Sequence, residues 1–140
     1  MEAAANNSYT TRALAGIGLA SLAVGALFVA LIDPTKVNFL PVCPLLKLTG
    51  LACPGCGLTR GFHALFHGEI VTALDFNALI PLWAGLIGIF AVSLLMFTVR
   101  GKAFSIEMFR PWMFWVFLGV LLAFAVLRNI PAYPFSVLYP

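Results

Sequence analysis

Three long segments of the chain contain no charged residue, and this feature constrains the fold more than any other. The segments run over residues 13–32, 78–99 and 111–127. A helix rises about 1.5 Å per residue and a bilayer core is about 30 Å thick, so the first two can cross it. The third reaches about 25 Å before Arg128, whose long side chain can place its charge at the interface. The sequence predicts an all-α integral membrane protein with three transmembrane helices.

The composition supports this class and excludes several others. Hydrophobic residues make up 62% of the 140 residues and charged residues 9%, too few charges for the surface of a soluble enzyme, a coiled coil or a disordered tail. The net charge of +3 comes without any run of Lys or Arg, so we expect no nucleic-acid partner. We expect residues 1–140 to form one membrane domain. The first apolar segment is longer than a signal-peptide core, so we expect it to be retained.

The basic residues outside the three segments indicate the orientation in the membrane. One side carries Arg12, Arg100, Lys102 and Arg110, and the other carries Lys36, Lys47, Arg60 and Arg128. The two sides are equal in number, but three residues of the first set lie in one short loop, which carries more weight. We therefore expect the N-terminus inside, and the long first loop, residues 33–77, on the outer face.

That first loop holds all three cysteines and both histidines of the chain. Within it, Pro54 and Gly55 predict a turn, and a short amphipathic helix is expected to start near Cys56 and end at Gly68. The helix is too short to cross a bilayer, so it would lie at the interface or re-enter from it. The candidate metal or redox residues are Cys53, Cys56, His63 and His67, with Arg60 and Cys43 in support.

Metal or cofactor binding is one interpretation of these residues. Cys53 and Cys56 have the Cys-x2-Cys spacing of a zinc or other soft-metal site, and His63 and His67 have the i, i+4 spacing of two ligands on one helix face. On a continuous helix, Cys56 and His63 would lie about 10.5 Å apart along the axis, too far for one ion. One pair joined by Cys43 fits better. A haem or chlorophyll-type pigment on a histidine is a further possibility that the spacing does not select.

Two other interpretations of the cysteines stay open. In a redox site, Cys56 at a helix N-terminus with Arg60 one turn later would have a lowered pKa. No strand is predicted before this segment, so a thioredoxin-like fold is not expected. In a structural loop, a Cys43–Cys53 or Cys43–Cys56 disulfide would hold the chain together in an oxidising compartment. Asn77 is expected to cap the N-terminus of the second span.

The motif pattern resembles a known family. Cys-Pro-Gly-Cys-Gly-Leu-Thr-Arg, then His67-Gly68, Asn77 and a final Arg128-Asn129-Ile130-Pro131, is similar to the bacterial domain-of-unknown-function family 2752 over residues 41–131. One departure is Asn77-Ala78 in place of the family's Asn-Pro. We expect Arg128-Asn129 to end the third span at the interface, and the resemblance adds contact of this pair with the Cys loop. The resemblance also implies a small protein of the bacterial inner membrane and supplies no reaction.

Small residues on the first span indicate that another helix packs closely against it. The pairs Gly16/Ala20, Ser21/Gly25 and Ala26/Ala30 favour close helix packing, either against a partner subunit or against the chain's own helices. The sequence has no catalytic constellation, so an enzyme is not expected. The leading hypothesis is an accessory subunit of a larger membrane complex, with the Cys loop as a structural or docking element. The alternative is a membrane thiol-redox or metal/cofactor-binding protein that uses Cys53, Cys56 and His63 or His67.

Overall fold

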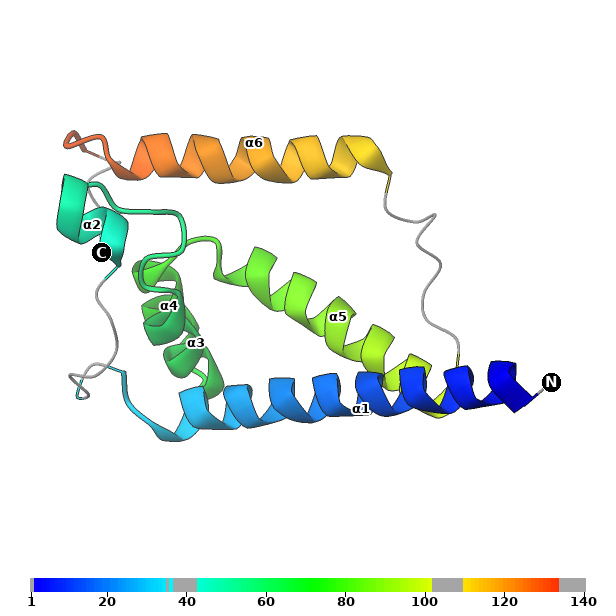
Figure 1. The fold of residues 1–140 in the computed structure, drawn as a ribbon. Coiled ribbons are helices and arrows are strands. Elements are labelled where there is room, and N and C mark those ends of the chain that lie inside the picture. Colours follow the sequence, from blue (N-terminus) through cyan, green and yellow to red (C-terminus); the bar gives the residue numbers. More distant parts are fainter. Residues whose placement is uncertain (1, 35, 37–42, 102–109, 134–140) are drawn as a thin grey trace. The chain divides into compact units, whose positions relative to one another are not determined.

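A computed structural model describes residues 2–34, 36, 43–101 and 110–133, with side chains from residue 9 onward (Figure 1). Lys102, counted above for orientation, lies outside these residues. The helices are α1 (Glu2–Leu31), α2 (Pro44–Thr49), α3 (Leu58–Phe66), α4 (Ile70–Phe76), α5 (Ile80–Arg100) and α6 (Pro111–Arg128). The described part of the chain contains no strand, which confirms the predicted all-α class.

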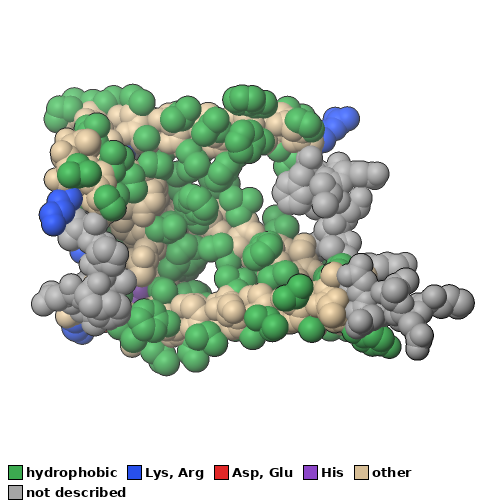
Figure 2. All heavy atoms as spheres, viewed as in Figure 1, with side chains coloured by type: hydrophobic (Ala, Val, Ile, Leu, Met, Phe, Trp, Pro, Cys, Tyr) green, Lys and Arg blue, Asp and Glu red, His purple; other side chains and the backbone are tan. Residues whose placement is uncertain are grey.

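Three helices are long and apolar enough to cross a membrane, which confirms a multi-pass membrane protein. They are Tyr9–Leu31 within α1, all of α5, and all of α6. Hydrophobic side chains cover much of the visible sides of these helices, as contact with lipid requires (Figure 2). The helix α1 begins well before the apolar segment because Glu2 and the three alanines after it are strong helix formers.

The chain divides into two compact units. The first, here called the helix-pair unit, comprises Met1–Phe28 and Leu82–Phe109. The second, here called the cysteine unit, comprises Val29–Pro81 and Arg110–Pro140. The helix-pair unit holds most of α1 and α5. The cysteine unit holds α2, α3, α4 and α6, together with every cysteine and histidine.

In the helix-pair unit, small residues of α1 lie close to α5. A Cβ added to Gly16 would lie 3.6 Å from Thr98, and one added to Gly18 would lie 3.6 Å from Leu94. The Arg12 guanidinium donates to the carbonyls of Thr98 at 3.0 and 3.1 Å and of Val99 at 2.8 Å. The last carbonyls of a helix lack partners within the helix and carry partial negative charge, so Arg12 stabilises the end of α5.

In the cysteine unit, α3 packs against α4 and the start of α5. The buried centre of this contact consists of Ala64, Ala73 and Ile80. Gly61 is also buried here, and a Cβ on it would lie 2.7 Å from Ile80 Cδ1 and 3.1 Å from the Ala73 carbonyl oxygen. Only glycine therefore allows α3 to approach this closely.

The short helices differ in part from the sequence expectation. The predicted short amphipathic helix after the Cys-Pro-Gly-Cys turn is α3, and it begins at Leu58, two residues after Cys56, because Gly57 has φ +80°, a left-handed conformation that a helix interior does not accept. Gly68 has the same φ and ends the segment as predicted. The helices α2 and α4 were not predicted, since six and seven residues are too few to show a clear hydrophobic period.

Candidate thiol site

A tight turn carries two of the three cysteines. The Cys56 N–H donates to the Cys53 carbonyl at 3.0 Å, and the Leu58 N–H donates to the Gly55 carbonyl at 3.1 Å. A Cβ on Gly57 would overlap the Phe76 carbonyl oxygen. The glycine therefore lets the turn pass directly beneath the end of α4 and enter α3.

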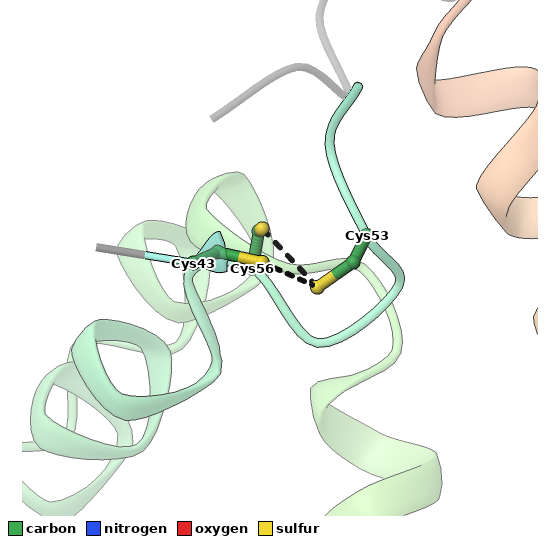
Figure 3. Close-up of side chains that lie close together, drawn as sticks. All are labelled: Cys43, Cys53 and Cys56. Atoms are coloured by element: carbon green, nitrogen blue, oxygen red, sulfur yellow. Dashed lines mark hydrogen bonds between the residues drawn. The ribbon is translucent and has the colours of Figure 1, made fainter. Parts of the chain in front are cut away.

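The third cysteine, Cys43, precedes α2 and joins the other two. Its Sγ lies 3.4 Å from Cys53 Sγ, and Cys53 Sγ lies 3.2 Å from Cys56 Sγ. All three Sγ atoms lie within 4.8 Å of one another. Figure 3 shows the hydrogen bonds that join the Cys53 thiol to both of the other thiols. All three are free cysteines, so the structure contains neither disulfide that the structural interpretation named.

Arg128 at the end of α6 is fully buried and binds the backbone around the cysteines. Its guanidinium donates to the carbonyls of Cys56 at 2.8 Å, Phe76 at 3.1 Å and Cys53 at 3.3 Å. It also lies over the Phe124 ring, 5.4 Å from the centroid. One side chain therefore connects the cysteine turn, the end of α4 and the end of α6.

Two asparagines complete the support of the turn. The Asn77 amide donates to the carbonyls of Pro54 at 2.8 Å and Cys56 at 3.1 Å, while its Oδ1 accepts the Leu79 N–H at 2.9 Å. The Asn129 amide donates to the Ala52 carbonyl, and its Oδ1 accepts the Ala52 N–H, both at 2.8 Å. These bonds give partners to the carbonyls of Ala52, Pro54 and Cys56, which fixes the path of the chain through the cysteines.

The thiols differ in acidity because their surroundings differ. A hydrogen bond from the Leu46 backbone N–H, with smaller contributions from the Cys53 and Cys56 thiols, lowers the pKa of Cys43 to about 7. Burial, followed by hydrogen bonds with the other two thiols, raises the pKa of Cys56 to about 12. The expectation that Cys56 has a lowered pKa is therefore wrong: Cys56 precedes α3 and is buried, whereas Arg60 is exposed.

We expect Cys43 to be the first cysteine that iodoacetamide modifies in the metal-free protein. Because its pKa is lowered to about 7, its thiolate is abundant above pH 7 and is lost as the pH falls toward 6. The alkylation rate should fall accordingly, with its midpoint near that pKa, and Cys56, which is 7% exposed, should stay unmodified. Peptide mass spectrometry after timed labelling measures both. Faster modification of Cys56 than of Cys43 would contradict this assignment.

The histidines and Arg60 form a different group. The side chains of Arg60, His63 and His67 line a pocket of about 240 Å³ in the cysteine unit. The other lining residues are Asp33, Pro34, Ala64, Glu69, Thr72 and Phe76, with no cysteine among them. The structure therefore separates the two pairs of candidate ligands, in line with the distance argument along the helix.

Three thiols so close together form a donor set for a thiophilic metal. Thiolates that bind one Zn²⁺ at about 2.3 Å stand roughly 4 Å apart, so shifts of up to about 1 Å would bring these three Sγ atoms to that separation. Sequence reasoning found these cysteines and named Cys43 as a supporting residue that could join one of the two ligand pairs. It expected Arg128 and Asn129 to end the third span, and only the family resemblance indicated their contact with the Cys loop, which the structure shows. Their role was indicated in the sequence by the position of a charged residue, Arg128, directly after an uncharged span and directly before Asn129.

Comparison with known proteins agrees with the predicted resemblance. The model of a family described as "Protein of unknown function (DUF2752)" matches residues 43–91, which include all three cysteines, both histidines and Asn77. Arg128 and Asn129 lie outside the matched segment. No curated protein and no solved structure matches the chain.

Proposed function

Taking residues 43–91 as a DUF2752 segment of a multi-pass membrane protein, we propose that the chain binds one thiophilic metal ion. The ligands are the Sγ atoms of Cys43, Cys53 and Cys56, and the ion is Zn²⁺ or Cu⁺. One observation carries the proposal: these three Sγ atoms, from two separate segments, lie within 4.8 Å of one another. Thiolates are soft ligands and select these ions over harder cations.

The number of thiols favours a metal over a disulfide. A disulfide uses two cysteines, whereas three thiols that meet at one point supply three ligands to one ion. Three thiolates around Zn²⁺ carry a net charge of about −1, and around Cu⁺ about −2. The Arg128 guanidinium, which is bonded to the Cys53 and Cys56 carbonyls, places a positive charge beside this centre. Buried cations of this kind lower the cost of assembling thiolates.

The support of the site also resembles that of a metal centre. The carbonyls of Cys53, Pro54 and Cys56 accept hydrogen bonds from Arg128 and Asn77. Partners beyond the ligands commonly fix ligand orientation, and their loss typically costs about 10–100-fold in metal affinity. Three protein ligands leave a fourth position of a tetrahedral ion open, which allows the ion to exchange or to contact a further ligand.

Serine variants of the three cysteines test this function. We expect Cys43→Ser, Cys53→Ser and Cys56→Ser each to lower metal affinity by about 100-fold or more, because each removes one of three thiolates. Chelator competition in detergent, with a chromogenic Zn²⁺ chelator and separately with a Cu⁺ chelator under reducing conditions, measures the affinity and distinguishes the ions. The exposed neighbour variant Thr59→Ser should bind like the parent.

The pH dependence provides an internal check on the same titration. The pKa of Cys56 is raised to about 12, so its proton must leave when the metal binds. Affinity should therefore rise with pH between 6 and 8. Unchanged affinity in Cys43→Ser, or no bound ion in the parent chain under either condition, would contradict the proposal.

A second candidate function, the accessory subunit, has its own supporting observation. Within the helix-pair unit, one face of α1 lines a shallow groove of about 560 Å³. Its lining residues are Ile17, Ala20, Ser21, Val24, Gly25 and Phe28. Nothing described lies within 4 Å of a Cβ on Gly25, so a partner's transmembrane helix could approach closely here.

Co-purification in mild detergent tests the subunit role. Gly25→Leu should release a partner that the parent retains, because the added side chain fills the groove. Ala23→Leu places the same leucine side chain at an exposed position that does not line the groove, and should retain the partner. A parent chain that purifies without any companion would contradict this role.

We also propose that the protein lies in the bacterial inner membrane, with its first loop on the outer face. The support is the family resemblance and the concentration of three basic residues, Arg100, Lys102 and Arg110, around the short loop after α5. A membrane-impermeant maleimide should then label Cys43 in intact cells. Labelling only after the cells are broken would place the loop inside.

A further inference from the structure

The two histidines of the cysteine unit are held in the same way. His63 Nδ1 lies 2.7 Å from the Val29 carbonyl oxygen, and His67 Nδ1 lies 2.9 Å from the His63 carbonyl oxygen. A carbonyl oxygen can only accept a hydrogen bond, so each Nδ1 carries the proton. In the neutral rings, both Nε2 atoms therefore have a lone pair available.

This arrangement is the one that histidine ligands show in metal sites. A ligating imidazole commonly donates its other N–H to a carbonyl or a carboxylate, which fixes the tautomer and the ring orientation. Here the two fixed rings belong to one turn of helix and its cap, with centroids 4.5 Å apart. The i, i+4 spacing places both on one side of the helix.

Two acidic side chains accompany the imidazoles. Asp33 and Glu69 line the same pocket of about 240 Å³. Asp33 forms an ion pair with Lys36 at 3.0 Å, and Glu69 and Arg60 are both exposed, so ion pairing and water reduce the effect of these charges. The preference for a cation therefore comes from the two Nε2 lone pairs, which only a cation or a proton donor can accept.

From these observations we propose that His63 and His67 form a second metal site, separate from the thiols, that binds a borderline divalent cation such as Zn²⁺ through both Nε2 atoms. Imidazole nitrogen with nearby carboxylate or water oxygen is a donor set that such ions prefer. The site does not depend on the thiol site, because no cysteine lines the pocket.

Zinc titration of the full chain tests the second site. The protein is purified without a polyhistidine tag, made metal-free in detergent, and titrated with Zn²⁺ against a chromogenic chelator. The parent should bind one more ion than His63→Asn or His67→Asn does. Asparagine keeps a side-chain N–H for the carbonyl and removes Nε2, so far-UV circular dichroism should show unchanged helix content. Thr72→Val, at another residue of the pocket lining, should bind like the parent.

A second arm separates this site from the thiol site. After the accessible thiols are blocked with N-ethylmaleimide, the parent should keep the imidazole-bound ion, and His67→Asn should lose it. His67 is exposed at the C-terminal cap of α3, so its replacement leaves the packed core of the unit untouched. Equal stoichiometry in the parent and His67→Asn, or an equal loss in Thr72→Val, would overturn the proposal whatever the thiols bind.

Discussion

Replacing Arg128 by glutamine is expected to lower the free energy of unfolding of the cysteine unit by about 3–5 kcal/mol. The guanidinium is 0% exposed and donates to the carbonyls of Cys53, Cys56 and Phe76. A buried carbonyl that loses its donor costs about 1–3 kcal/mol, and glutamine can satisfy at most one or two of the three. Thermal unfolding in detergent measures the loss of stability. Hydrogen exchange of the backbone amides in residues 52–58 then shows whether the loss is located at the cysteine turn.

Arg110→Gln is the matched control for this variant. Arg110 precedes the first turn of the same helix and is exposed, so its replacement removes the same charge without removing a buried donor. We expect a change of less than about 0.5 kcal/mol. Arg128→Lys should fall between the two, because one ammonium cannot reach carbonyls in three directions. Equal stability of Arg128→Gln and Arg110→Gln would contradict the role assigned to Arg128.

Gly57→Ala is expected to have the second large effect, a loss of about 3–4 kcal/mol in the same unit. Gly57 has φ +80°, and a Cβ on it would overlap the Phe76 carbonyl oxygen. Part of the loss comes from forcing an L side chain into the left-handed region. The rest comes from displacing the Phe76 backbone, which is less able to move than a flexible side chain. Because the displaced segment carries Cys56, metal binding should weaken together with stability.

Alanine variants of two further glycines, compared by the same unfolding measurement, separate the cost of the left-handed conformation from the cost of the overlap with Phe76. Gly68 also has φ +80°, but no atom of the described residues lies within 4 Å of a Cβ on it, so Gly68→Ala should cost about 1 kcal/mol. Gly55 lacks a positive φ, and a Cβ on it would meet only Cys53 Sγ at 3.8 Å, an ordinary contact. Gly55→Ala should therefore be nearly neutral. A Gly57→Ala loss no larger than that of Gly68→Ala would show that the close approach to α4 does not matter.

The transmembrane helices could be predicted from sequence because the bilayer imposes one simple requirement on them. A long run without charge has few alternatives in a chain of this size, so α1, α5 and α6 followed directly. The turn at Pro54-Gly55 and the helix end at Gly68 could also be predicted from the sequence, because both depend on local backbone preference.

The site was harder to predict because it depends on tertiary contacts. Nothing in the local sequence of Cys43 indicates that its thiol lies 3.4 Å from that of Cys53. Likewise, Arg128 lies 72 positions after Cys56, and its bonds to the turn depend on where α6 ends. The acidity of the thiols was misjudged for the same reason, since burial of Cys56 is a property of the fold and not of its neighbours in sequence.

X-ray absorption at the zinc edge tests the central claim most directly. The sample is the His67→Asn chain loaded with one equivalent of Zn²⁺ in detergent, so that the imidazole pair does not contribute. We predict a first shell with three sulfur atoms at about 2.3 Å. A first shell made only of nitrogen or oxygen atoms at about 2.0–2.1 Å would contradict the assignment of Cys43, Cys53 and Cys56 as the ligands.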